Sequence, residues 1–203
     1  MSSYLLWALI GYLSGSVMYA YWIPRLFCGV DTVQSSDDGN PGAANAFHLA
    51  GVPVGILTLC CDLLKGAVPV YLAVRALGLG RPWFALVLVS PVAGHAFPVL
   101  NGFRGGKAIA VSFGALLGLS PVLQPFLALA AAYLTFSLLF VVEPHLWRSV
   151  VTFCVFVMDN LFFAPCPAVG LGCVAISLLV MLRHGMAYRG ERIRVSWLGR
   201  DRK

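Results

Sequence analysis

Charged side chains are scarce in this 203-residue sequence: aspartate, glutamate, lysine and arginine together make up 11% of it, whereas 60% is hydrophobic. Soluble domains carry about a quarter charged residues. A soluble fold of this length could not remove so much apolar surface from water. The composition therefore predicts a membrane protein whose solvent is largely the bilayer.

Metal-binding and disulfide patterns are also missing. The sequence has six cysteines, none in a CxxC pair. Cys60 and Cys61 adjoin each other inside an apolar run, where cysteine usually behaves as a small buried hydrophobe. No set of His, Cys and Asp has the spacing of a zinc site. We therefore expect neither a metal held by the protein nor another cofactor.

Several signatures of nucleophilic catalysis are absent as well. There is no GxSxG turn, and no cysteine lies near a histidine in an activating arrangement. One large acyltransferase class carries an aspartate five residues after a histidine. Here the residues five beyond His48, His95, His145 and His184 are Pro53, Leu100, Val150 and Arg189. That chemistry is excluded.

What the sequence does have is a series of apolar runs separated by glycine, proline and charge. We expect an all-α polytopic protein, a single membrane domain over 1–203 with seven transmembrane helices. Met1–Gly11 lacks the basic start of a secretory signal, so the first helix is expected to remain. The predicted spans are about 4–23, 52–74, 83–100, 107–119, 122–142, 149–164 and 168–183, followed by a basic tail at 184–203.

The fourth predicted span is short. It starts directly after a glycine pair, and a short span beside irregular backbone is typical of a segment that lines a cavity instead of lipid.

Positive charge indicates the orientation. If the C-terminus is inside, eleven of the 14 lysines and arginines lie on the inner side, Arg75 and Arg81 lie outside, and Lys65 falls within a span. The positive-inside rule then predicts a multi-pass cell-membrane protein with a cytoplasmic C-terminus and an external N-terminus. The loops 24–51, 101–106 and 143–148 would share the cytoplasmic face with the tail. The net charge of +6 favours lipid phosphates and anionic substrates over nucleic acid, because no nucleic-acid-binding module is apparent.

The segment 101–110, NGFRGGKAIA, places two cations beside a glycine pair. Gly105 and Gly106 precede a predicted helix, whose first N–H groups and dipole attract anions. Arg104 can donate two hydrogen bonds to a phosphate, and Lys107 adds a point charge. The alternative is a flexible turn whose cations merely set the topology. The segment 101–110 is not a Walker loop, because its glycine spacing is one residue short and Ala108 stands where a Walker loop has Ser or Thr.

The loop 35–51, SSDDGNPGAANAFHLAG, is rich in small residues. Gly39, Gly42 and Gly51 permit positive φ, Asn40 and Asn45 carry amides, and exposed backbone N–H groups of this kind can hold a phosphate. Taken alone, the loop is better explained as a solvated turn.

Three ionisable side chains fall in predicted spans. Asp62 and Lys65 share a helix face, which favours a structural ion pair over a substrate contact. His95, in GHAFP, is a functional candidate because ionisable groups in membranes usually have a role. Its alternative is a histidine that packs between helices. His184 stands at the membrane edge before the basic tail.

Five motifs occur in an order that resembles the bacterial membrane acyl-phosphate:glycerol-3-phosphate acyltransferases, the PlsY-type family. They are GYLSGS (11–16), GNPGAAN (39–45), DLLKG followed by Pro69 (62–69), GHAFPV with FRGGK (94–107), and His184 before the tail. The resemblance implies seven membrane helices and an active site facing the cytoplasm.

The resemblance also implies a reaction. The primary hydroxyl of glycerol 3-phosphate attacks the carbonyl of a fatty acyl phosphate, giving lysophosphatidate and phosphate, the first step of phospholipid synthesis. The implied partners are these two substrates and membrane lipids. The implied catalytic residues are Lys107, His184 and Asn40. Phosphate binding falls to Gly39, Gly42, Asn45, Arg104, Gly105, Gly106 and Lys107, and supporting roles fall to Ser16, Asp62, Lys65 and His95.

The chain departs from the family pattern at several positions. Asp38 replaces a serine, Ala44 a threonine, His48 an arginine, Ala108 a glycine and Ala187 an asparagine, and a serine-rich motif near 149–155 is scarcely recognisable. The sequence thus indicates a divergent member, for which another acceptor or loss of activity stays open. A transporter or binding protein for a phosphorylated metabolite is a further alternative, although the internal repeat common in carriers is not evident.

Overall fold

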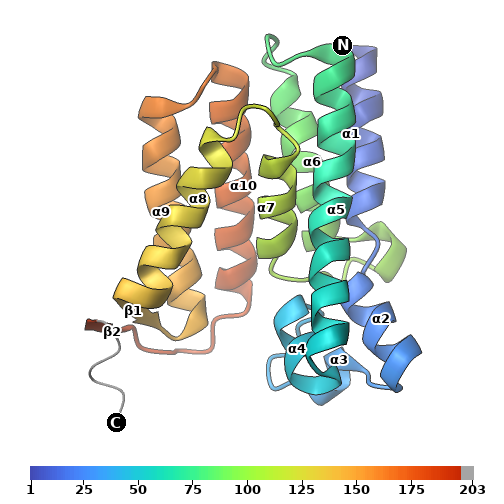
Figure 1. The fold of residues 1–203 in the computed structure, drawn as a ribbon, viewed down its shortest axis with the longest axis vertical. Helices are drawn as coiled ribbons and strands as arrows, with labels where there is room; N and C mark the ends of the chain where they lie inside the picture. Colours follow the sequence, from blue (N-terminus) through green and yellow to red (C-terminus); the bar gives the residue numbers. More distant parts are fainter. Residues whose placement is uncertain (198–203) are drawn as a thin grey trace.

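The computed structural model describes residues 1–197, so the predicted basic residues Arg200, Arg202 and Lys203 lie outside the described part. Seven helices run roughly along the long axis of the molecule, with the N-terminus at the upper end (Figure 1). They are α1 (Ser2–Gly15), α5 (Val52–Leu77), α6 (Phe84–Ala96), α7 (Ile109–Leu117), α8 (Gln124–Leu134), α9 (His145–Phe163) and α10 (Pro167–Met186).

Shorter elements gather at the lower end of Figure 1, below the long helices. They are α2 (Tyr19–Cys28), α3 (Thr32–Ser35), α4 (Ala43–Ala50), the 3₁₀ turn η1 (Val99–Asn101), the π-helical turn η2 (Thr135–Leu139), β1 (Phe140–Glu143) and β2 (Arg194–Trp197). The two strands form an antiparallel ribbon in which Phe140 lies opposite Trp197. The loops that carry the predicted site therefore meet at one end of the bundle.

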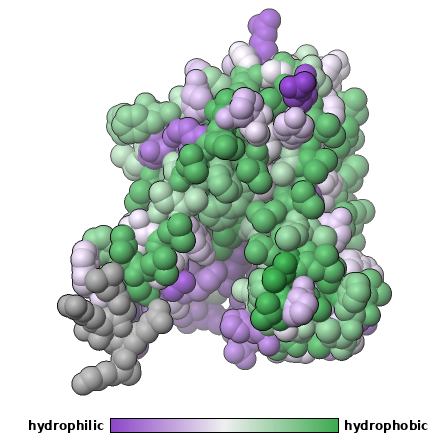
Figure 2. All heavy atoms as spheres, viewed as in Figure 1, coloured by the Kyte–Doolittle hydropathy of each residue, from purple (hydrophilic) through white to green (hydrophobic). Residues whose placement is uncertain are grey.

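The lengths of the helices and the apolar surface indicate that the molecule is embedded in lipid. Five helical stretches are long and apolar enough to cross a membrane: Ser2–Cys28, Val52–Leu77, Phe84–Asn101, His145–Phe163 and Pro167–Met186. Gln124–Leu139 is a shorter apolar stretch. Apolar residues cover most of the face in Figure 2, and polar residues gather in a hollow near its lower end. The chain is an integral membrane protein built almost entirely of α-helices, as its composition predicts.

The first predicted span, 4–23, is interrupted. Helix α1 ends at Gly15 and α2 starts at Tyr19 in a new direction (Figure 1). The break frees the carbonyl of Val17, which accepts a 2.7 Å hydrogen bond from the ammonium of Lys65 on α5. A buried partner distant in sequence thus satisfies the broken helix, and local sequence has no signal for it.

The fifth predicted span, 122–142, also ends early. Helix α8 ends at Leu134, and the chain continues through η2 into strand β1. Most of the predicted loop 143–148 is instead the first turn of α9. Strand β1 exists because it pairs with β2 from the tail, for which the sequence predicts only a basic segment. The remaining spans agree with the helices to within a few residues.

Helix α7 is the shortest of the seven. Its nine residues span about 14 Å, less than half of a bilayer core of about 30 Å. It lies against α5 with almost no side chain between the backbones: a Cβ on Gly114 would lie 2.1 Å from the carbonyl oxygen of Leu63. Glycine makes this contact possible and holds the start of α7 beside the cavity described next.

Candidate active site

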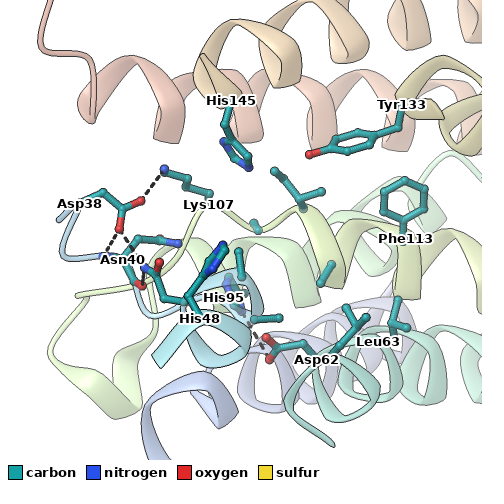
Figure 3. A pocket seen from close by; sticks show the side chains of 18 residues that line it. Asp38, Asn40, His48, Asp62, Leu63, His95, Lys107, Phe113, Tyr133 and His145 are labelled. Carbon is teal, nitrogen blue, oxygen red and sulfur yellow. Dashed lines mark hydrogen bonds and ion pairs between the residues drawn. The ribbon is translucent and has the colours of Figure 1, made fainter. Parts of the chain in front are cut away.

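A cavity of about 450 Å³ opens where the loop before α4 meets the start of α7 and the start of α9 (Figure 3). Its mouth is polar, and its interior is largely apolar. The mouth carries Asp38, Asn40, Asn45, His48, Lys107 and His145. The interior is lined by Leu59, Leu63, Ile109, Phe113 and Tyr133. The short α7 and the irregular backbone before it do line a cavity, as the sequence predicts.

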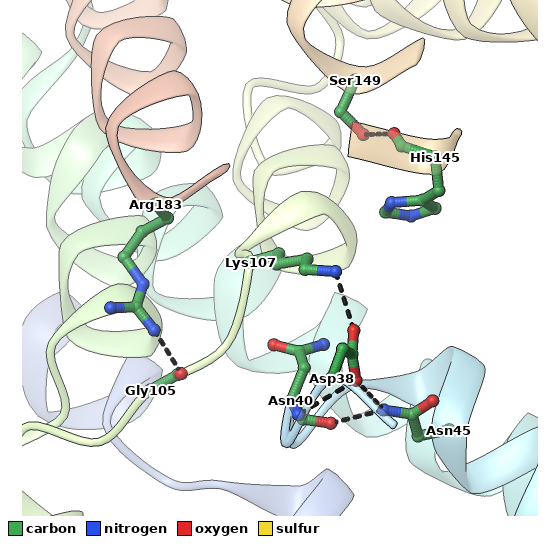
Figure 4. Close-up of polar contacts among 8 residues, drawn as sticks. All are labelled: Asp38, Asn40, Asn45, Gly105, Lys107, His145, Ser149 and Arg183. Atoms are coloured by element: carbon green, nitrogen blue, oxygen red, sulfur yellow. Dashed lines mark hydrogen bonds and ion pairs between the residues drawn. The ribbon is translucent and has the colours of Figure 1, made fainter. Parts of the chain in front are cut away.

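Two loops that are far apart in sequence meet at this mouth through an ion pair. The Lys107 ammonium donates to Asp38 Oδ2 at 2.8 Å. Asp38 Oδ1 accepts from the backbone N–H of Asn40 at 3.1 Å and from the Asn45 amide at 2.8 Å (Figure 4). The predicted residues Asn40, Asn45 and Lys107 therefore lie together, with Asp38 between them. Gly39, at φ +59°, and Gly42 shape the same turn.

The charge state of Asp38 follows from this geometry. Partial burial acts to raise the pKa of its carboxyl group, but the hydrogen bonds from Lys107 and Asn45 and the positive charge of Lys107 outweigh burial. The pKa of Asp38 is therefore lowered from the ordinary aspartate value. At neutral pH the carboxylate is ionised and compensates the charge of Lys107.

The glycine pair has a framework role. The Gly106 N–H donates to the carbonyl of His95 at 3.1 Å, so it is not free for an anion. Arg183 on α10 donates to the carbonyls of Gly105 and Gly106 at 2.6 and 3.2 Å. A Cβ on Gly106 would lie 2.4 Å from Nε2 of His95, so only glycine fits. The pair fixes the path of the chain into Lys107, a role that the sequence did not predict.

Of the two arginines near this segment, the structure favours the one that sequence reasoning missed. Arg104 is exposed and lines neither the first cavity nor a second one beside it. The second cavity, of about 570 Å³, is more polar and shares Asp38, Lys107 and His145 with the first. Arg183 lines it together with Arg189. The only sequence signal for Arg183 was its place beside His184.

Two histidines stack at the boundary between these cavities. His145, the first residue of α9, lines both and lies across the mouth from Lys107 (Figure 3). The centroids of the His145 and His184 rings are 5.8 Å apart, and the angle between the two ring planes is 20°. His184 is fully buried, and its Nδ1 lies 2.8 Å from the Val180 carbonyl, which makes Nδ1 the donor and leaves Nε2 as an acceptor. The predicted His184 thus lies behind His145, which the sequence had singled out only in excluding the histidine–aspartate motif.

Supporting residues lie deeper. Lys65 and Asp62 form a buried ion pair of 2.7 Å, as the sequence favours. Asp62 and His95 also line the cavity floor, with His95 Nδ1 4.0 Å from Asp62 Oδ1. Ser16 does not face the cavity; it is buried and its hydroxyl donates to the Tyr12 carbonyl. Lys65 links α5 to the end of α1 through the Val17 carbonyl, and Asp62 and His95 bring α5 and α6 together beneath the site.

The other departures from the family pattern are distributed around the two cavities. His48 and Ala44 line the first cavity, and Ala187 lines the second. Ala108 adopts φ +63°, a left-handed conformation that suits glycine better. Within residues 1–197, no three His, Cys, Asp or Glu side chains are grouped so as to hold a metal ion.

Amide and lysine donors above a largely apolar cavity, at one end of a membrane-embedded bundle, are typical of membrane proteins that bind a ligand with an anionic head and an apolar chain. Residues 5–190 match the family model described as Glycerol-3-phosphate acyltransferase. The chain belongs to this family.

Individual relatives agree. The glycerol-3-phosphate acyltransferase of Syntrophotalea carbinolica is 35% identical over 189 residues, which cover 91% of each chain. That of Pseudomonas aeruginosa (strain LESB58) is 45% identical over 131 residues, 64% of this chain and 68% of the relative.

Two solved structures also superimpose closely, both of PlsY, an integral membrane glycerol 3-phosphate acyltransferase. The glycerol 3-phosphate form has a TM-score of 0.77 and 27% identity, covering 91% of this chain and 89% of PlsY. The lysophosphatidic acid form has a TM-score of 0.73 and 26% identity, covering 90% and 88%. The transporter alternative has no support from these relatives.

Proposed function

We propose that this protein transfers a fatty acyl group from an acyl phosphate to the primary hydroxyl of glycerol 3-phosphate, giving lysophosphatidate and phosphate. This is the first step of phospholipid synthesis. The observation that carries the proposal is the meeting of Lys107 with Asn40 and Asn45 at the mouth of an apolar cavity. Such a site binds a phosphate head and leaves room for an acyl chain behind it.

The two substrates occupy different parts of this space. The acyl chain of the donor extends past Leu63 and Phe113 into the apolar interior of the first cavity. Its carbonyl and phosphate remain at the mouth beside Lys107. Glycerol 3-phosphate enters from the polar second cavity, where Arg183 and Arg189 add positive charge.

The reaction needs no nucleophile from the protein, because the acyl phosphate is already activated. The glycerol oxygen bonds to the carbonyl carbon, the bond from that carbon to the phosphate oxygen breaks, and the electron pair leaves with phosphate. The hydroxyl proton ends on a phosphate oxygen. Lys107 and the loop amides stabilise the negative charge on the phosphates, and the two loops hold the reactants close together.

His145 and His184 extend this proposal to the acceptor hydroxyl. His145 lines both cavities, and its ring faces the mouth. We assign His145 to the hydroxyl as a hydrogen-bond acceptor. His184 positions it by stacking behind it.

The membrane arrangement belongs to the same proposal. We propose that α1, α5, α6, α7, α8, α9 and α10 make seven crossings, with the C-terminus and the active site facing the cytoplasm. The support is the distribution of the described cations other than Lys65 between the two ends of the helix bundle. Arg75 is near the end of α5 and Arg81 lies between α5 and α6, opposite the site. The others belong to elements or loops that lead to the site end: Arg25, Arg104, Lys107, Arg148, Arg183, Arg189, Arg192 and Arg194.

The direct test incubates the purified protein with palmitoyl phosphate and glycerol 3-phosphate and measures lysophosphatidate by mass spectrometry. Acyl-CoA and acyl-carrier-protein donors run beside it, and we expect product from acyl phosphate alone. A parallel reaction in excess chelator is expected to proceed at the same rate. Absence of product with every donor would contradict the proposed function.

A further inference from the structure

We infer that Asp38 is an internal ligand of the phosphate site, which occupies the phosphate-binding donors when substrate is absent and must leave them for substrate to bind. The inference rests on the proposed function in one respect: the same donors hold the substrate phosphate. It adds that this chain carries its own competitor for them.

The competitor is defined by three contacts. The Lys107 ammonium, the Asn40 backbone N–H and the Asn45 side-chain amide all converge on the two carboxylate oxygens of Asp38, at 2.8, 3.1 and 2.8 Å. An ammonium with two neutral N–H donors is a typical phosphate-binding set. A phosphate monoester carries more charge and more acceptor oxygens than a carboxylate, so it can replace the carboxylate on the same donors.

Asp38 is also placed where it can leave. Its side chain is 42% exposed, and that of Lys107 is 17% exposed. Exposed ion pairs are weak because water and salt compete with them. The other lysine–aspartate pair at the site is different: the side chains of Lys65 and Asp62 are only 2% and 1% exposed. Asp38 lies at the shared rim of both cavities, so a rotation into the aqueous side frees Lys107.

Such a competitor lowers the affinity for every anion that uses the site by the same factor. The apparent dissociation constant equals the intrinsic one divided by the fraction of molecules in which the donors are free of Asp38. A carboxylate that merely stood nearby would act differently. Its repulsion would scale with ligand charge and cost a dianion about twice the free energy it costs a monoanion.

The test compares Asp38→Asn with Asp37→Asn. The first variant keeps the shape of the side chain and an oxygen for the loop N–H groups, but it no longer pairs with Lys107. The second makes the same charge change one residue away. Asp37 is exposed and lines the second cavity but not the first, and within residues 1–197 its side chain makes no hydrogen bond or ion pair, so this variant reports the effect through space of a nearby carboxylate. Binding of inorganic phosphate and of dimethyl phosphate is measured by calorimetry in detergent at pH 8 and 0.15 M salt.

We expect Asp38→Asn to lower both dissociation constants by the same factor, about fivefold to tenfold, and Asp37→Asn to change them less than about twofold. Unchanged binding in Asp38→Asn overturns the inference. Equal effects of the two variants overturn it as well. A third result would also overturn it: the dissociation constant of inorganic phosphate, the dianion, falls by about the square of the factor measured for dimethyl phosphate, the monoanion. That pattern indicates repulsion through space.

Labelling of Lys107 separates this inference from the proposed function. With no substrate present, acetic anhydride should modify Lys107 several-fold faster in Asp38→Asn than in the unmodified chain, as read by peptide mass spectrometry. Asp38→Ser provides the same comparison if the Asn variant lacks a thermal unfolding transition. Faster labelling without lysophosphatidate synthesis would contradict the proposed function alone. Synthesis with unchanged labelling in both folded variants would contradict the role of Asp38 alone.

Discussion

Lys107 is the residue that joins the parts of the site. It follows the glycine pair fixed by Arg183, it pairs with the loop before α4, and it lines both cavities. Its ammonium is therefore the cation closest to both the apolar and the polar approach to the mouth. Arg104, three residues earlier, is exposed and lines neither cavity.

Replacing Lys107 by alanine should lower kcat/KM by at least about a hundredfold, the usual cost of removing a donor to a charged transition state. The fold should survive, because an exposed ion pair contributes about 1 kcal/mol or less. Arg104→Ala should lose less than about threefold. Initial rates and thermal midpoints of both purified variants check this. Equal losses of kcat/KM in the two variants would indicate that Arg104 also binds phosphate.

The Asp38–Lys107 ion pair should stabilise the folded protein at all but strongly acid pH. The pKa of Asp38 is lowered in the folded protein by its hydrogen bonds and by Lys107. Its contribution to stability is therefore present above the pKa of the unfolded chain, and it is lost as the pH falls through the lower pKa of the folded chain. Between pH 5 and 8 it should be constant.

The measurement is the difference in thermal midpoint between the unmodified chain and Asp38→Asn at a series of pH values. We expect a small constant difference above about pH 5, because an exposed pair contributes about 1 kcal/mol or less, and its disappearance only under strongly acid conditions. A difference that changes near pH 6 to 7 would show that another group controls the pair.

At the scale of elements, glycine sets the distances between helices. A Cβ on Gly114 of α7 would lie 2.1 Å from the Leu63 carbonyl of α5, and a Cβ on Gly15 of α1 would lie 2.0 Å from the Pro91 carbonyl of α6. Close contact between small residues is a main source of helix association in membranes. The same contacts place the start of α7, and hence Lys107, beside the cavity.

Gly114→Ala should therefore destabilise the protein by about 1–3 kcal/mol or more, since backbone atoms cannot move aside as a flexible side chain does. Gly185→Ala is the matched control: it lies in α10, and a Cβ there has no neighbour within 4 Å. Thermal midpoints in detergent compare the two. Similar midpoints for both variants would show that α7 can move away from α5 at little cost.

At the scale of the whole molecule, polar groups are concentrated at one end. Two cavities, the loops 24–51 and 97–108, the β-ribbon and most of the described cations share that end, whereas the opposite end carries short turns (Figures 1 and 2). This polarity suits an enzyme that takes an apolar chain from the bilayer and a polar partner from water.

The proposed orientation predicts where cysteines react. Cys28 is exposed at the site end, and position 81 is exposed at the other. In chains whose other cysteines are replaced, a membrane-impermeant maleimide should label Cys28 only in inside-out vesicles and Arg81→Cys only in right-side-out vesicles. The reverse pattern would invert the proposed topology, and labelling of both from one side would contradict the crossing count.

The sequence by itself determined the membrane class, the approximate positions of most helices, the short fourth segment and the polar loops that carry the site. Each of these depends on local composition, because transfer of a side chain into lipid and the conformations open to glycine are properties of a few adjacent residues. Asn40, Asn45 and Lys107 became candidates through the family resemblance, because the glycine-rich loop that carries the two asparagines is by itself better explained as a solvated turn.

Only the tertiary structure decided what these residues contact. In the folded chain Asp38 accepts from the donors expected to hold phosphate, and the Gly106 N–H donates to the His95 carbonyl. Arg183 donates to the carbonyls of the glycine pair, and the His145 ring stacks on the His184 ring. The tertiary structure also broke the first helix at the Val17 carbonyl held by Lys65 and formed the ribbon from the tail. Apart from the bond between Gly106 and His95, these contacts join residues that are 39 to 78 positions apart, and no local pattern in a chain encodes the distances between such residues.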